Sequence, residues 1–319
     1  MQITYVHQHE FPLLGEVHSS ILKSLMYFDL FRYPLTLPEI IRFASIPIHH
    51  LHIAEDALQQ LEDNLMVYRF GEFWSLNSDY GNIERRQKGN RSAMKIWDKA
   101  IMRSKFIQRF PFVRSVNISG SLSKNYFDAE ADFDFFIITQ PNRLWLCRML
   151  LTIYKKFFLL NSRKYFCINY FIDTESLEIP DKNIFTAIEI VTLKNMSGEN
   201  LYNNFMQSNN WVKQYFPNYL PEKQMLPQKE KENVIKHHSE KLLQNKIGDR
   251  LDTVCYKITL YFWKRKFKNM TAIEFENNLR SRKHVSKHHP QGFQFKVLEG
   301  YKNRIHTFEQ QHNVTLYNG

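Results

Sequence analysis

A glycine turn followed by two alternating aspartates, within residues 113–139, constrains this chain more than any other stretch. A short alternating apolar run leads to Gly120 and Ser121, and after ten intervening residues Asp132 and Asp134 open a second apolar run. Residues i and i+2 of a β-strand point to the same face, so the two carboxylates would project together, with backbones roughly 7 Å apart. Carboxylates held in this way repel each other unless a divalent cation lies between them. The stretch therefore predicts a strand that carries a metal-binding acidic pair.

This order and spacing resemble the signature of the nucleotidyltransferase superfamily typified by DNA polymerase beta, which reads Gly-Ser, about ten residues, then Asp-x-Asp in an apolar strand. The resemblance implies that Asp132 and Asp134 are catalytic and hold Mg²⁺, or Mn²⁺ in its place. It also implies that Gly120 and Ser121 bind the phosphates of an NTP. The alternative interpretation is a buried glycine turn followed by a solvated acidic hairpin.

Nucleotidyl transfer joins a nucleoside monophosphate to an acceptor oxygen or nitrogen and expels pyrophosphate. Its barrier arises mostly from charge, and two divalent ions about 3.5–4 Å apart stabilise both the attacking and the leaving oxygen. A glycine at position 120 lets backbone N–H groups approach a phosphate, and Ser121 adds a hydroxyl donor. Lys124 lies in the same loop and would neutralise the triphosphate, unless it is a solvated loop lysine. The acceptor is not identified, because members of one fold act on many acceptors.

The superfamily usually supplies a third carboxylate from a later strand, and the sequence predicts such a strand at residues 164–172. The predicted third acid is Asp173 at the end of this strand, and the alternative residue is Asn169 at its centre. Asparagine can ligate through its carbonyl oxygen but brings no charge and cannot act as a base. If Asn169 holds the position, catalysis depends on Asp173, Glu130 or Asp128. The alternative to an enzyme is a catalytically impaired protein of the nucleotidyltransferase fold that binds a nucleotide, nucleic acid or protein partner.

The predicted fold class is α+β, in a globular chain of 319 residues with 43% hydrophobic and 15% aromatic residues. We expect a winged-helix-like domain in residues 1–80 and a linker helix in residues 81–110. A nucleotidyltransferase domain with a mixed β-sheet and helices would occupy residues 111–220. Residues 221–319 would form a basic, helical C-terminal region.

The winged-helix prediction depends on three helical patterns and a hairpin. The last helix, residues 49–65, precedes two short strands around Gly71, and Thr36 with Glu39 forms a capping-box pattern that starts the second helix. Winged helices often read DNA through the third helix, but here that helix carries four acidic residues and no Lys or Arg. DNA phosphates require the opposite charge, so we expect a protein-contact or positioning role for this domain.

The net charge of +11 is distributed unevenly, with an acidic first part and basic parts after residue 80. The basic runs Lys264–Lys268 and Arg280–Lys287 predict contact with nucleic acid, although they would equally suit an acidic protein or the acidic N-terminal domain. NTP is the expected small-molecule partner.

The cysteines, the first residues and the apolar segments indicate the cellular compartment in which the protein folds. Cys147, Cys167 and Cys255 lie far apart and read as free thiols in a reducing compartment, without a disulfide or zinc site. The first residues lack the pattern of a signal peptide, and residues 144–160 are interrupted by charges, as in a buried helix. We therefore expect a cytoplasmic protein without a membrane span.

Overall fold

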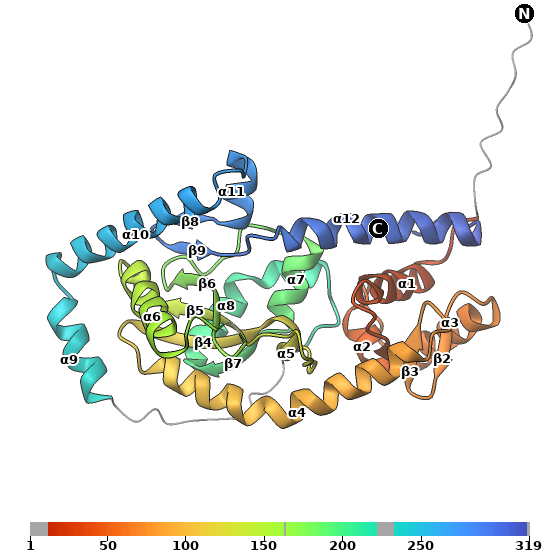
Figure 1. The fold of residues 1–319 in the computed structure, drawn as a ribbon. Helices are drawn as coiled ribbons and strands as arrows, with labels where there is room; N and C mark the ends of the chain where they lie inside the picture. Colours follow the sequence, from red (N-terminus) through yellow and green to blue (C-terminus); the bar gives the residue numbers. More distant parts are fainter. Residues whose placement is uncertain (1–11, 163, 222–232, 318–319) are drawn as a thin grey trace, which may run out of the picture. The chain divides into compact units, whose positions relative to one another are not determined.

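The computed structural model describes residues 12–162, 164–221 and 233–317, and it is a mixed α+β structure with two β-sheets (Figure 1). The chain divides into two compact units. Unit 1 contains residues 1–86, 213–220 and 296–319, and unit 2 contains residues 87–212 and 221–295. The two sheets belong to different units, so each unit is described by itself.

Unit 1 combines three N-terminal helices and most of α12 (Phe293–His312) with a small antiparallel sheet. The N-terminal helices are α1 (Glu16–Asp29), α2 (Leu37–Arg42) and α3 (Leu51–Asp63), and the sheet has the order β1 (Leu35–Thr36), β3 (Phe73–Ser75), β2 (Tyr68–Phe70). The predicted capping box is confirmed, since the Thr36 backbone N–H donates to Glu39 Oε2 at 2.8 Å. The predicted hairpin turns at Gly71, which has a φ of 63°.

Unit 2 is built on a mixed six-stranded sheet. Its strands are β4 (Val113–Ser119), β5 (Asp134–Thr139), β6 (Cys167–Asp173), β7 (Lys194–Ser197), β8 (Ser281–Arg282) and β9 (Val285–Lys287), in the order β7-β4-β5-β6-β9-β8. Only β5 and β6 run parallel, and all other neighbours are antiparallel. A parallel pair needs a crossover connection, and helix α6 (Leu144–Phe158) provides it.

Helices cover both faces of this sheet. Helix α4 (Gly81–Gln108) and α6 pack on the face that carries Val116, Phe135 and Ile137, and together they form the main hydrophobic core. On the other face, Phe136 contacts Phe205 of α8 at 5.1 Å between ring centroids. The other described helices of this unit are α5 (Gly120–Ser123), α7 (Ile184–Val191), α8 (Glu199–Ser208), η1 (Asn210–Gln214), α9 (Val234–Leu243), α10 (Lys246–Lys266) and α11 (Ala272–Asn278).

Strand β7 lies within residues 181–218, whose sequence pattern is helical, and β8 and β9 lie within the C-terminal region that the sequence predicts to be helical. They contain four, two and three residues, too few for an alternating apolar pattern to be recognised. They are strands because neighbouring segments offer backbone partners, as Tyr170 of β6 does for Lys287 of β9. The C-terminal region is therefore not wholly helical, since it completes one edge of the central sheet.

Two further predictions from the sequence concern membrane-spanning helices and the state of the cysteines. No helix within the described ranges has both the length and the apolar character needed to span a bilayer. Cys147 and Cys167 are buried and Cys255 is partly buried, and all three are free thiols.

Candidate functional site

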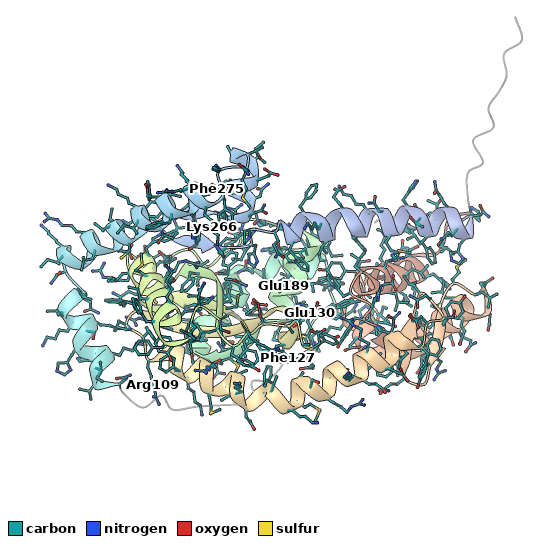
Figure 2. All side chains as sticks on the ribbon, viewed as in Figure 1. Arg109, Phe127, Glu130, Glu189, Lys266 and Phe275 are labelled. Atoms are coloured by element: carbon teal, nitrogen blue, oxygen red, sulfur yellow. The ribbon has the colours of Figure 1, made fainter. Side chains whose placement is uncertain are left out.

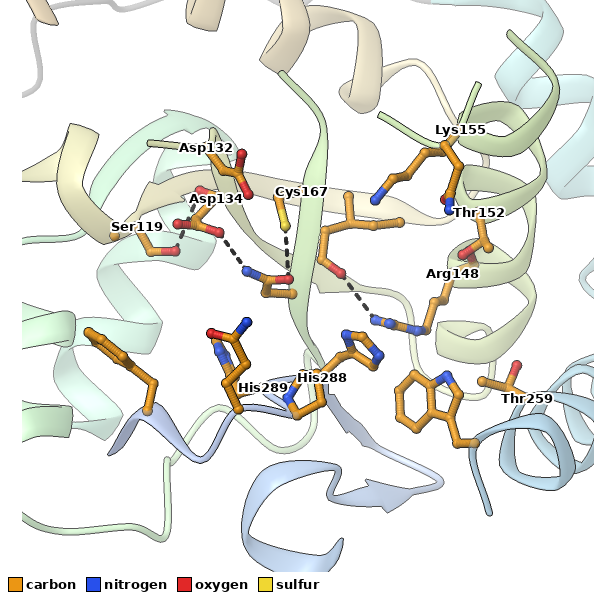
Figure 3. Close-up of a pocket in the computed structure, with 18 of the residues that line it drawn as sticks. Ser119, Asp132, Asp134, Arg148, Thr152, Lys155, Cys167, Thr259, His288 and His289 are labelled. Carbon is orange, nitrogen blue, oxygen red and sulfur yellow. Dashed lines mark hydrogen bonds between the residues drawn. The ribbon is translucent and has the colours of Figure 1, made fainter. Parts of the chain in front are cut away.

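The two aspartates of the motif lie together at the start of β5. Asp134 is the first residue of the strand, and Asp132 lies two residues earlier in the segment that enters it. Phe133 between them donates its backbone N–H to Lys164 O at 3.0 Å, which ties this segment to the start of β6. Figure 3 shows the carboxyl groups of Asp132 and Asp134 next to each other. The structure thus brings the predicted acidic pair together.

Gly120 touches this pair directly. Ser119 pairs with Asp134 across β4 and β5, and Gly120 follows with a φ of 70°, in the left-handed region that favours glycine. A Cβ atom at this position would lie 2.3 Å from Asp134 Oδ2, closer than any side chain permits. The neighbouring Ser121 lies in the single turn of α5, and Lys124 follows that turn. The glycine is therefore required both by its backbone conformation and by the closeness of the carboxylate.

A third carboxylate, Glu189 of α7, joins this cluster and was not predicted. Glu189 Oε2 accepts the backbone N–H of Gly120 at 3.3 Å, and its Oε1 accepts from Lys124 Nζ at 2.7 Å. Glu189 thus engages two of the donors that the sequence assigns to a phosphate. The available signal was a single charged residue in the otherwise apolar helix IFTAIEIV.

The later strand presents Asn169, and not Asp173, to the acidic pair. Asn169 lies at a bulge in β6, and its Nδ2 donates to Asp134 Oδ1 at 2.5 Å. Asp173 pairs with Thr139, five residues beyond Asp134 and about 16 Å along the strand. The carboxylate of Asp173 instead accepts the backbone N–H of Glu175. The structure therefore does not bring the predicted third acid to the aspartates.

The two other acids considered from the sequence lie in the loop before Asp132. Asp128 accepts from the Tyr126 hydroxyl at 2.9 Å and from two backbone N–H groups of its own loop, including that of Ala131. Its carboxylate therefore holds the loop. Glu130 lines the cleft described below and is exposed.

The electrostatics of the cluster favour a cation. Burial, followed by the nearby charges of Glu189 and Asp132, raises the pKa of Asp134 to about 7, although a hydrogen bond from Cys167 and the charge of Lys124 oppose the shift. Within residues 12–162, 164–221 and 233–317, no group of three or more His, Cys, Asp or Glu side chains is arranged to hold a metal ion. Mg²⁺ is usually held by one or two carboxylates together with substrate phosphates, so Asp132 and Asp134 fit that ion.

These residues line a cleft of about 880 Å³ in unit 2, which extends across β6. Figure 3 shows Asp132 and Asp134 on one side of Cys167, and Arg148, Thr152 and Lys155 on the other. Helix α10 forms a further wall, and Figure 2 shows its Lys266 apart from Glu130 and Glu189. The cleft therefore has an acidic side and a basic side. Its polar and aromatic lining includes Ser119, Gly120, Glu130, Asp132, Asp134, Arg148, Thr152, Lys155, Lys156, Asn169, Glu189, Phe262, Trp263, Lys266, His288 and His289.

Arg148 is the most unusual residue of the basic side. It is only 6% exposed, donates Nη1 to Ile168 O at 3.4 Å, and lies over the rings of Phe171 and Trp263 at 5.0 and 4.9 Å. No described carboxylate pairs with it, and burial lowers its pKa to about 10. A buried charge without a counter-ion is unfavourable, so this side of the cleft favours an anionic ligand. From the sequence, Arg148 and Lys155 are predicted only as charges that interrupt an apolar helix.

The basic, His-rich stretch after β8 reaches the same cleft. The His288 backbone N–H donates to Asn169 O at 2.9 Å, and the His288 ring packs on Trp263 at 4.7 Å. Burial, with the charge of Lys287, lowers the pKa of His289 to about 4, so that its imidazole is neutral at pH 7. The end of this stretch is therefore part of the lining, which the sequence did not predict.

Comparisons of the chain with protein-family models, with curated proteins and with solved structures found no match.

Proposed function

We propose that this protein is a Mg²⁺-dependent nucleotidyltransferase of the superfamily typified by DNA polymerase beta, which transfers an NMP from an NTP to an acceptor and releases pyrophosphate. The observation that carries the proposal is the contact between Gly120 and Asp134, since a Cβ on the glycine would lie 2.3 Å from the carboxylate. A phosphate bound at this turn would lie beside the acidic pair. The proposal includes the finer architecture: unit 2 would have the nucleotidyltransferase fold, and α1 to α3 with β2 and β3 would form a winged-helix-like module.

Each residue of the acidic side has a role in this proposal. Asp132 and Asp134 would hold Mg²⁺, which supplies charge stabilisation for the α-phosphoryl group and the leaving pyrophosphate. The backbone N–H of Gly120, the Ser121 hydroxyl and Lys124 would donate to phosphate oxygens. Gly120 has a φ of 70° in the left-handed region, and it carries no Cβ that would separate a bound phosphate from Asp134.

Glu189 would supply the carboxylate that Asn169 lacks. In the free protein Glu189 accepts from Gly120 N and Lys124 Nζ, and an incoming phosphate would take over both donors. The released carboxylate would remain close to Asp134 and accept the proton of the acceptor hydroxyl. The acceptor oxygen then bonds to the α-phosphorus, and the bond from this phosphorus to the bridging oxygen breaks, releasing pyrophosphate.

The proposal is tested by calorimetry with each NTP in the presence of Mg²⁺, followed by measurement of pyrophosphate release. Wild type should bind at least one NTP in a Mg²⁺-dependent manner, and Asp132→Asn should lose this dependence. Glu189→Gln should keep NTP binding and lower kcat by roughly 10²-fold or more, because it removes the proton acceptor.

Glu130→Gln is the matched control, since Glu130 lines the same cleft without a hydrogen bond to the turn. A large loss in Glu130→Gln, with full activity in Glu189→Gln, would reassign the proton acceptor to Glu130. Failure of wild type to bind any NTP with Mg²⁺ would overturn the proposed function.

A second candidate function is a catalytically impaired member of the same fold that only binds a nucleotide. It is favoured by Asn169, which donates to Asp134 from the strand where the resemblance leads us to expect a carboxylate. Pyrophosphate release by the wild-type protein would reject this alternative.

A further inference from the structure

The basic side of the cleft forms a continuous surface, which we define as the α6–α10 wall. It consists of Arg148, Thr152, Lys155 and Lys156 from α6, and Phe262, Trp263 and Lys266 from α10. The two helices are in contact, as the rings of Trp145 and Tyr256 lie 4.9 Å apart. From this wall we propose that the acceptor is a single-stranded nucleic acid, whose terminal ribose hydroxyl is the attacking group. The inference rests on the proposed function.

The cations of the wall lie in a row that suits successive phosphates. The cations Arg148 and Lys155 have Thr152 between them, four residues after the first and three before the second. This spacing puts all three side chains on one face of the helix. Figure 3 shows Lys155 extending from α6 toward the cleft, above Thr152 and Arg148. Arg148 is fixed by two aromatic rings and a backbone carbonyl, and it has no carboxylate partner among the described residues. Such a fixed, uncompensated cation suits a phosphate anion.

The wall also offers aromatic rings beside these cations. Phe262 is 59% exposed although it borders the cleft, and it stands one turn before Lys266. Trp263, the next residue of α10, also lines the cleft and carries Arg148 on its ring. Exposed rings interleaved with lysines are the combination by which proteins bind single strands, since bases stack on the rings while cations contact the backbone. An acidic protein partner would use the lysines but would leave the rings without a function.

The wall is separate from the groups that would bind the NTP. Gly120, Lys124 and Asp134 lie together in one cluster, and Figure 3 shows Arg148 and Lys155 across Cys167 from Asp134. An NTP bound at the turn therefore leaves the wall available to the second substrate. Gly120, Asp132 and Asp134 line the same cleft as the wall, so a strand on the wall would direct its end toward the acidic pair.

The test measures binding of a labelled ten-nucleotide single-stranded RNA by fluorescence anisotropy, with EDTA and without NTP. This readout does not depend on metal or on turnover. Wild type should bind with an affinity that falls steeply with salt, and Lys155→Ala/Lys156→Ala should bind more weakly, with a salt slope smaller by about 1.4. Phe262→Ala should weaken binding about 5- to 100-fold while leaving the salt slope nearly unchanged, because it removes stacking and no charge.

The matched control is Lys95→Ala/Lys105→Ala, which removes two exposed lysines of α4 outside the cleft and should leave binding almost unchanged. Equal weakening by both double variants would overturn the inference, because it would indicate unspecific attraction to a basic protein. Tighter binding of an acidic peptide than of the RNA, lost in Lys155→Ala/Lys156→Ala, would also overturn it. Asp132→Asn should bind RNA normally, so loss of Mg²⁺-dependent NTP binding tests the proposed function separately from the acceptor.

Discussion

At the scale of single residues, Tyr170 is a buried polar group without a compensating contact. Its hydroxyl is inaccessible to solvent, and no described group forms a hydrogen bond with it. Burial raises the pKa of this phenol, so it stays neutral at ordinary pH. A buried hydroxyl without a partner costs about 1–3 kcal/mol, which a change to phenylalanine would avoid.

We therefore predict that Tyr170→Phe raises the free energy of unfolding by about 1 kcal/mol, measured by urea denaturation. Tyr256→Phe is the matched control, since the Tyr256 hydroxyl donates to Ser281 O at 3.0 Å. This second change should lower stability by about 1 kcal/mol. Equal destabilisation by both variants would show that the Tyr170 hydroxyl has a partner.

Residues of the site could be predicted where one short motif contains them, as with Gly120, Asp132 and Asp134. Glu189 and Arg148 come from helices far along the chain, and only the tertiary fold brings them to the cleft. The choice between Asn169 and Asp173 also could not be made from the sequence. It depends on the pairing of β6 with β5, which aligns Cys167 with Asp134 and carries Asp173 to the other end of the strand.

At the scale of elements, the β4–α5 turn and the β2–β3 hairpin both bend at a glycine in the left-handed region. Gly71 has a φ of 63°, and a Cβ there would meet nothing within 4 Å. Gly120 has a φ of 70°, and a Cβ there would meet Asp134. An alanine at Gly71 would therefore introduce backbone strain alone, whereas an alanine at Gly120 would add a steric clash with Asp134.

Gly71→Ala should lower the free energy of unfolding by about 1 kcal/mol, since alanine is disfavoured in this backbone region. Gly120→Ala should lower it by about 3 kcal/mol, because overpacking adds to the same strain. It should also abolish Mg²⁺-dependent NTP binding. Thermal denaturation and calorimetry of both variants measure the two effects. Normal nucleotide binding by Gly120→Ala would contradict the close approach at the turn.

Elements with a strong apolar period could be predicted from the sequence, and α3 and α6 lie close to their expected bounds. The edge strands could not, because β8 has two residues and β9 has three. Their conformation is set by the open edge of β6 and not by local preference. Short edge strands of this kind depend on tertiary context.

At the scale of the whole molecule, unit 2 joins distant segments by ion pairs whose strength depends on pH. Asp181, before α7, accepts from Arg280 at 2.8 Å and from Lys287 at 3.1 Å. Burial alone would raise the pKa of Asp181, but the hydrogen bond from Arg280 and the charges of Lys287 and Arg280 hold it below its ordinary value. The paired carboxylate therefore stabilises the folded state above pH about 4. This contribution is lost as the pH falls through the lowered pKa.

We predict that Asp181→Asn lowers the free energy of unfolding by about 3 kcal/mol at pH 7, because it leaves the largely buried Lys287 with only the neutral Gln294, and Arg280 with only the half-exposed Glu276. The difference from wild type should shrink as the pH falls from about 4 to 2, measured by denaturant titration at each pH. Glu178→Gln is the control, since the Glu178–Lys182 pair is about half exposed on both sides and should contribute under 1 kcal/mol. A difference that stays constant down to pH 2 would contradict the assigned pairing.

The pairing of β6 with β9 has a consequence for the time course of synthesis. Tyr170 aligns with Lys287, more than one hundred residues later in the chain. A ribosome adds roughly 5–20 residues per second, so β6 leaves it roughly 6–23 s before its edge partner exists. During this interval the edge of β6 can pair with other nascent chains, and the cleft lacks His288 and His289. The lining of the cleft is therefore complete only after His288 and His289 have been synthesised.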